Sequence, residues 1–254
     1  MTKKTLLFVW FLALSLTGSV AHAHSLWLNI DNAQPGVGQV VPIEIGWGHK
    51  FPKDEIIKEG FLKELYGVDP NGERVAVEQI SLTEYEFVPK APGTYTLLAN
   101  THPGFLSKTT EGYKLQSKKG LENVVSCFRY DIRAKAFVYV GKEAKDPEKA
   151  FGDILEIVPL KSPKDVKKGE TLPVKILFEE KPLAAVEVKA TYAGFSDEPH
   201  TFAVNTTTNG QGVAHIKILE KGDWMVNIVH EVPYPHPEEC DKYRNNCSLT
   251  FRAD

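Results

Sequence analysis

Short apolar stretches separated by turn residues recur along this chain, and they restrict it to an all-β fold. In the second half, about seven such stretches fall within about 100 residues, the spacing of an immunoglobulin-like or transthyretin-like sandwich. They cover residues 155–158, 172–178, 186–192, 200–206, 212–219, 224–231 and 247–252. Asn209-Gly210 between two of them is typical of a hairpin turn.

The first half shows the same alternation, so we expect a second β-sandwich there. Its predicted strands cover residues 26–30, 40–45, 74–82, 85–88 and 94–100, and residues 123–140 form either one long strand or a helix followed by a strand. Residues 142–152 are charged, contain Pro147 and Gly152, and have no periodicity. We therefore expect a linker over residues 142–152, an N-terminal domain over 24–141 and a C-terminal domain over 153–254.

The first 23 residues have the pattern of a secretion signal. Lys3 and Lys4 precede an apolar run over residues 6–16 that is too short to span a bilayer, and Ala21-His22-Ala23 is a small-x-small cleavage site. Cleavage after Ala23 would make His24 the first residue of the mature protein. We expect a periplasmic product with the signal peptide 1–23 removed.

Charge and hydropathy exclude two classes of partner. Without the signal peptide the chain carries 28 basic and 33 acidic side chains, a net charge of -5, so it has no basic surface for nucleic acid. No later stretch approaches the roughly 18 apolar residues of a membrane helix, so we expect no direct membrane insertion.

The three cysteines suit an oxidising compartment. Cys240 and Cys247 lie close together in a polar segment, and we expect them to form a disulfide. Cys127 would then be unpaired, either as a small buried side chain on a strand or as a thiolate metal ligand.

The predicted mature terminus is a ready-made metal chelate. A terminal His24 offers its α-amine and its ring nitrogen to the same ion, and the amine has a reference pKa of only about 7.7–8.0. A second histidine, His49, lies in a stretch where Gly46 and Gly48 flank Trp47, so we expect a tight loop that carries His49 out of the sheet. The plainer reading is that His24 is whatever cleavage leaves first and that His49 is an ordinary loop residue.

Two further histidines are candidates to complete the site. His102 follows a predicted strand and lies in the turn Thr101-His102-Pro103-Gly104. His230 shares one strand face with Trp224, Val226 and Ile228, which also suits a partly buried, hydrogen-bonded histidine without a metal.

Several segments resemble a known family. They are His24-Ser25-Leu26-Trp27-Leu28, Gly48-His49-Lys50-Phe51-Pro52, Ala91-Pro92-Gly93-Thr94-Tyr95, Arg129-Tyr130-Asp131, Lys135-Ala136-Phe137-Val138-Tyr139-Val140-Gly141, Leu155-Glu156-Ile157-Val158-Pro159-Leu160, Lys181-Pro182-Leu183-Ala184 and Gly222-Asp223-Trp224. Together they resemble a domain-of-unknown-function family of secreted, two-domain proteins described as periplasmic components of nickel and cobalt uptake systems (NikM-like).

The resemblance implies transition-metal uptake, with nickel or cobalt as the ion and a membrane metal-uptake transporter as a partner. His24 and His49 match the terminal and Gly-His positions of that family, and His230 lies in its final-hairpin strand. The resemblance assigns no position to His102, which depends on its place in the sequence alone.

The donor chemistry leaves the ion and the function class open. Amine and imidazole nitrogens suit Ni(II), Co(II), Cu(II) and Zn(II), so copper and zinc remain alternatives. A terminal histidine with a second histidine is also the copper site of secreted oxidative monooxygenases, and a sandwich without metal could be an adhesive or structural module. No Gly-x-Ser-x-Gly or His-Glu-x-x-His pattern indicates a hydrolase, and we expect no enzyme activity.

Overall fold

The computed structural model describes residues 24–141 and 150–254. The predicted signal peptide 1–23 lies outside these residues, and so does most of the predicted linker 142–152. Neither described stretch contains a helix that is long and apolar enough to cross a membrane.

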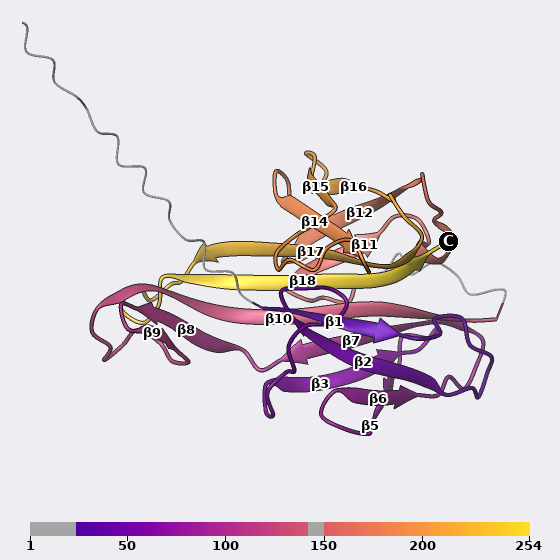
Figure 1. Ribbon diagram of the computed structural model, residues 1–254, viewed down its shortest axis with the longest axis horizontal. Helices are drawn as coiled ribbons and strands as arrows, with labels where there is room; N and C mark the ends of the chain where they lie inside the picture. The colour runs from indigo at the N-terminus through magenta and orange to yellow at the C-terminus, as the bar shows by residue number, and fades with distance from the viewer. Residues whose placement is uncertain (1–23, 142–149) are drawn as a thin grey trace, which may run out of the picture.

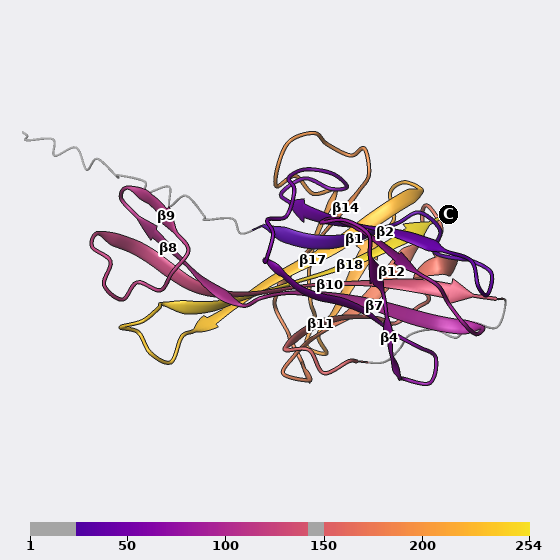
Figure 2. The same ribbon diagram turned by 90° about the horizontal axis from the view of Figure 1, so that it is seen from below.

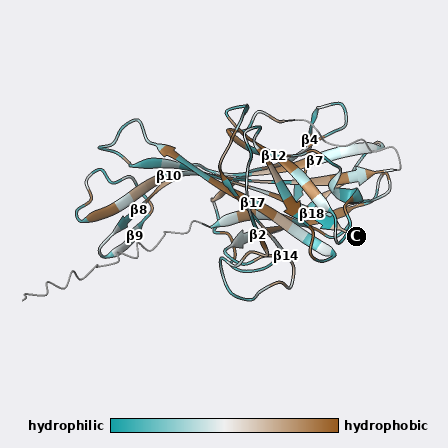
Figure 3. Cartoon of the chain, turned by 90° about the horizontal axis from the view of Figure 1, so that it is seen from above, coloured by the Kyte–Doolittle hydropathy of each residue, from teal (hydrophilic) through white to brown (hydrophobic). Residues whose placement is uncertain are grey.

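The described residues form strands, turns and one short 3-10 helix, η1 (Pro163–Asp165), so the predicted all-β class is confirmed (Figure 1). Hydrophobic stretches alternate with hydrophilic ones along the strands, and many loops are hydrophilic (Figure 3). Three sheets result. The first has the order β1 (Ser25–Ile30), β2 (Val41–Gly48), β6 (Glu84–Phe87) and β5 (Glu78–Gln79). The third contains β11 (Leu155–Pro159), β12 (Thr171–Phe178), β13 (Lys181–Pro182) and β16 (Val213–Lys217), which pairs with β12.

The second sheet is the largest and lies between the other two (Figure 1). Its order is β15 (Val204–Thr207), β14 (Glu187–Tyr192), β17 (Gly222–Pro233), β18 (Lys242–Ala253), β10 (Val124–Val140), β7 (Gly93–Thr101), β3 (Leu62–Val68) and β4 (Arg74–Ala76). A hairpin of β8 (Gly104–Thr109) and β9 (Gly112–Lys114) pairs with the first half of β10 and extends away from the body (Figure 2).

The two β-sandwiches share this central sheet. Side chains of a strand alternate between its two faces, and β10 contributes side chains to a different core on each face. Phe137 and Tyr139 belong to the core of the C-terminal half, whereas Ala136 and Val138 belong to the core of the N-terminal half. The halves are joined by parallel pairing of β10 with β18. Each half has its own core, while the boundary predicted at residues 142–152 stays a prediction.

The predicted disulfide between Cys240 and Cys247 is wrong. The structure pairs Cys240 with Cys127, at a Cα–Cα distance of 5.1 Å. Cys247 lies within β18, which begins at Lys242, just after Cys240. Five residue steps of extended strand from Lys242 to Cys247 span about 16 Å. This separates Cys247 from Cys240 by more than the ~7 Å between Cα atoms that a disulfide can bridge. Cys127 is on β10, which lies alongside β18 and so approaches the turn that holds Cys240. Cys247 is buried as a free thiol, and this burial raises its pKa to about 12.

Candidate metal centre

Strand pairing brings His24 and His49 together. β1 and β2 are antiparallel, with Ser25 opposite Gly48, so the next residue on each side is a histidine. The centroids of the two imidazole rings are 4.3 Å apart. The ring of Trp47 also stacks on that of His24, at 5.0 Å and an interplanar angle of 5°.

Side chains of β18 hold the start of β1 in place. Three of them donate hydrogen bonds to alternate backbone carbonyl oxygens of residues 24–28. The pairs are Asn246 with His24 (3.2 Å), Ser248 with Leu26 (2.5 Å) and Thr250 with Leu28 (2.7 Å). Because alternate carbonyls of a strand point to the same side, this series fixes the first strand against the central sheet. His24 is therefore positioned by residues more than 200 positions away in the sequence.

The loop after β2 turns sharply and brings a carboxylate to the histidines. Gly48 has φ +133°, and a Cβ there would lie 2.4 Å from Oδ2 of Asp54. That oxygen accepts the backbone N–H groups of His49 (2.7 Å) and Lys50 (3.2 Å). The backbone N–H of Glu55 then donates to the carbonyl of Trp47 at 3.0 Å, which returns the chain to the end of β2.

Glu55 completes a group of three possible ligands. Nε2 of His24 lies 3.1 Å from each carboxylate oxygen of Glu55. One donor atom from each of His24, His49 and Glu55 lies within 4.8 Å of the other two. Since metal–nitrogen and metal–oxygen bonds are about 2.0–2.2 Å long, a single ion between these atoms needs only small side-chain adjustments.

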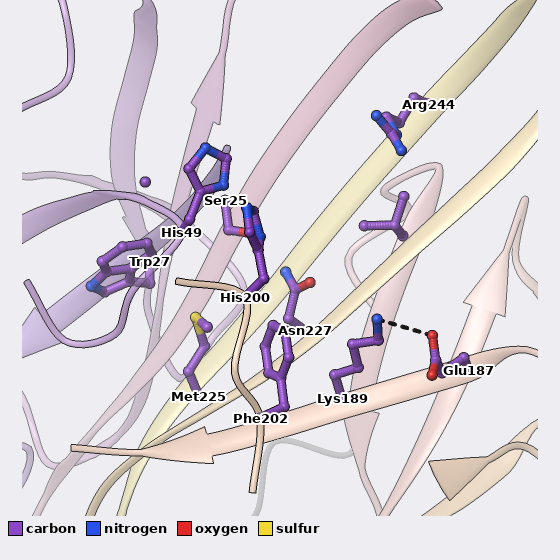
Figure 4. A pocket seen from close by; sticks show the side chains of 12 residues that line it. Ser25, Trp27, His49, Glu187, Lys189, His200, Phe202, Met225, Asn227 and Arg244 are labelled. Atoms are coloured by element: carbon purple, nitrogen blue, oxygen red, sulfur yellow. Dashed lines mark ion pairs between the residues drawn. The ribbon is translucent and has the colours of Figure 1, made fainter. Parts of the chain in front are cut away.

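A third imidazole approaches from the C-terminal half. The ring of His200 lies 4.2 Å from the ring of His49, centroid to centroid, and its backbone N–H donates to the His49 carbonyl at 2.9 Å. His200 has φ +59°, a left-handed conformation that non-glycine residues adopt rarely and often at functional sites. Figure 4 shows His49 and His200 side by side.

The environment keeps the His49 ring neutral. Burial lowers its pKa most, the nearby His24 and His200 lower it further, and the carboxylates of Glu55 and Asp54 only partly compensate, so the pKa falls to about 4. A neutral imidazole is the form that binds a metal, because a ring nitrogen must be free of its proton.

The other two predicted ligands, His102 and His230, lie elsewhere. Phe178 packs edge-on against the ring of His230, at 4.7 Å, and burial lowers the pKa of His230. Asn227 and Val229 lie on the face of β17 opposite to His230, and they line a cavity together with His49. His102 has an exposed side chain after β7, and its backbone N–H donates to the Phe61 carbonyl. Neither belongs to the group of His24, His49 and Glu55.

Sequence reasoning missed Glu55 and His200. Glu55 is one of several charged residues in its segment, and nothing in the local sequence marks it as a ligand. His200 was expected in a strand over residues 200–206, but β15 begins only at Val204. The preceding Ser196-Asp197-Glu198-Pro199 is rich in turn-forming residues and could have indicated a loop.

The histidines separate two cavities. One, of about 160 Å³, is lined by His49, His200 and residues of β14 and β17, including Lys189 and Asn227 (Figure 4). The other, of about 460 Å³, is lined in part by His24, His49, Trp47 and Glu55. We call it the aromatic cavity, because its lining also includes Phe61, Leu106, Tyr113, Leu115, Phe128 and Tyr130.

Comparison with known proteins gives one family and a set of distant folds. A family model described as "Domain of unknown function (DUF4198)" matches residues 21–232. No curated protein matches the chain.

Similar solved structures include the D0-D1 domain of Intimin, at 12% identity, covering 88% of this chain and 96% of that one, with a TM-score of 0.25. The two tandem V-type regions of VCBP3, a v-region-containing chitin binding protein, are 7% identical, cover 89% and 99%, and have a TM-score of 0.25. The fibronectin(III)-like modules of Clostridium thermocellum CbhA are 8% identical, cover 87% and 92%, and have a TM-score of 0.20. At such low scores these structures carry no argument for this chain.

Proposed function

We propose that this chain, which belongs to the DUF4198 family of domains of unknown function, is an exported protein that binds one divalent transition-metal ion near its N-terminus. The observation that carries the proposal is the group of His24, His49 and Glu55, whose donor atoms lie within 4.8 Å of one another. Two imidazoles and a carboxylate form a donor set that divalent first-row ions favour.

Each residue has a distinct role in this proposal. His24 supplies its ring nitrogen and, once the signal peptide is removed, its α-amine. His49 supplies a neutral ring, and Glu55 supplies the negative charge that offsets the ion. Asp54 positions His49 by accepting its backbone N–H, as outer-shell partners do in metal sites. The ring of His200 packs against that of His49 but does not belong to the group of three possible ligands, so its role is to position His49.

We further propose that the ion is nickel or cobalt and that the protein serves their uptake through a membrane transporter. Support comes from the resemblance to the NikM-like family at His24 and His49. The donor set suits copper and zinc as well, so the preference for nickel or cobalt rests on the resemblance alone.

A copper-dependent oxidase is the second candidate. One specific observation favours it: the predicted terminal histidine and His49 have ring centroids 4.3 Å apart, beside a cavity with aromatic walls. Such a protein would consume oxygen and a reductant, whereas an uptake component would bind its ion without turnover.

The test is calorimetric titration of Ni(II), Co(II), Cu(II) and Zn(II) into the protein purified after export. We expect one ion per chain for the wild type. Removing a ligand in His49→Ala should weaken binding by more than the about 10–100-fold that loss of an outer-shell partner costs. His215→Ala, at an exposed position on β16, is the matched control and should bind like the wild type.

A second comparison tests the terminus itself. A variant with one extra alanine before His24 keeps the ring but displaces the amine, and it should bind the ion more weakly. Equal affinity in the wild type, His49→Ala and the extended variant would refute the proposed site. Oxygen consumption that depends on copper and a reductant would favour the oxidase instead.

A further inference from the structure

The aromatic cavity is continuous with the candidate ligands. His24 and Glu55 form part of its wall, so an ion bound there would face into the cavity. Its volume of about 460 Å³ falls within the ~300–1,000 Å³ typical of small-molecule sites.

The apolar part of the cavity wall is held together by contacts between aromatic rings. Phe61 packs edge-on against Trp47 at 6.0 Å and stacks on Tyr130 at 6.4 Å with an interplanar angle of 7°. Phe128, also on β10, is buried in the same wall. Stacked and edge-on rings of this kind form a rigid apolar surface.

The mouth of the cavity carries apolar side chains that are exposed. Tyr113 on β9 and Leu115 just after it are 54% and 60% exposed, and Ile56, which also lines the cavity, is exposed as well. The hairpin that carries Tyr113 projects from the body of the molecule (Figure 2). Exposed apolar side chains gathered around a cavity mark a binding surface.

A hydrated ion alone does not account for this surface. Water molecules around an ion need hydrogen-bonding partners, which aromatic and aliphatic side chains do not supply. An organic body, by contrast, gains free energy by displacing water from such walls. Lys58, which also lines the cavity, adds a positive charge that suits an anionic donor group.

We propose that the aromatic cavity holds the organic part of a metal chelate, a small molecule with an aromatic or aliphatic body whose own donors complete the coordination of the ion. The protein donors His24, His49 and Glu55 hold the metal, and the apolar wall holds the chelator. This inference rests on the proposed metal-binding function and specifies its ligand as a metal complex rather than a free ion.

The test uses Ni(II) alone, bipyridine alone, the nickel–bipyridine complex and the polar nickel–citrate complex. Each is titrated by calorimetry into the protein purified after export. The double variant Tyr113→Ser, Leu115→Ser removes the apolar mouth without touching a proposed ligand. The matched control, Val37→Ser with Ile80→Ser, replaces apolar side chains of similar exposure, 54% and 53%, that do not line the cavity.

We expect nickel–bipyridine to bind at least tenfold more tightly than Ni(II) alone, bipyridine alone or nickel–citrate. The mouth variant should lose this gain and keep the affinity for Ni(II), and the control variant should keep both. If Ni(II) binds but the complex gains nothing, or if the gain survives in the mouth variant, the inference is overturned while the metal site stands.

Two further outcomes are decisive. If the complex binds through the mouth residues but free Ni(II) does not bind, the chelate inference holds and the proposal of a free-ion site fails. If sedimentation shows that the protein forms a dimer that the mouth variant abolishes, the surface is covered by a second copy and the inference is overturned. Absence of binding by any probe overturns both proposals.

Discussion

Lys135 and Glu156 form a buried ion pair between the two halves, and breaking it should strongly destabilise the protein. Their side chains are only 2% and 1% exposed, and Nζ of Lys135 lies 2.9 Å from Oε1 of Glu156. Glu156 also accepts the backbone N–H groups of Phe151 and Gly152, at 2.9–3.0 Å. Lys135→Met would leave this carboxylate buried without its cation.

The magnitude follows from that burial. Removing one member of a buried pair costs about 3–5 kcal/mol, because the remaining charge loses its partner away from water. For a chain of this size, each kcal/mol lowers Tm by about 2–4 °C, so we expect a fall of at least about 6 °C. Lys135→Met combined with Glu156→Gln should recover most of the loss, since Gln keeps an acceptor for the two backbone N–H groups.

Urea denaturation measures both effects as shifts of the midpoint at constant m-value. Lys181→Met, at an exposed lysine on β13, is the control and should shift unfolding by no more than ~0.5 kcal/mol. A loss below about 1 kcal/mol in Lys135→Met, or a double variant no more stable than the single one, would refute the reasoning.

Three other predictions concern the loop, the disulfide and acidic pH. Gly48→Ala should weaken metal binding at least tenfold in calorimetry, with an unchanged circular dichroism spectrum, because a Cβ would displace Asp54. Cys127→Ser should lower the unfolding free energy by about 2–5 kcal/mol in urea without reductant, and an unchanged midpoint would contradict the bridge to Cys240. Burial lowers the pKa of His230 below its usual 6.5, so the unfolded chain binds more protons. The stability that is present above about pH 6.5 should therefore be lost as pH falls through the lowered pKa. The urea midpoint should depend less steeply on pH in His230→Gln than in the wild type.

Local sequence patterns predicted the class of secondary structure. Apolar alternation and turn residues predicted an all-β chain, because backbone period and turn chemistry are set by neighbouring residues. His49 does lie in a loop as expected, but Gly46, Trp47 and Gly48, which were expected to form that loop, are the last residues of β2 because they pair with β1. His24 stood out only through the processing signal before it, and its position beside His49 reflects the antiparallel register of β1 and β2.

The partners that complete the structure were decided by tertiary packing. Parallel pairing of β10 with β18 places Cys127 beside Cys240, which no spacing in the sequence indicates. His200 reaches His49 because β14 and β17 belong to the same sheet that supports β1. These contacts join segments more than 100 residues apart, and they form because buried strand faces must find complementary surfaces elsewhere in the chain. A local pattern shows that a strand has an apolar face, but only the packed fold determines what that face meets.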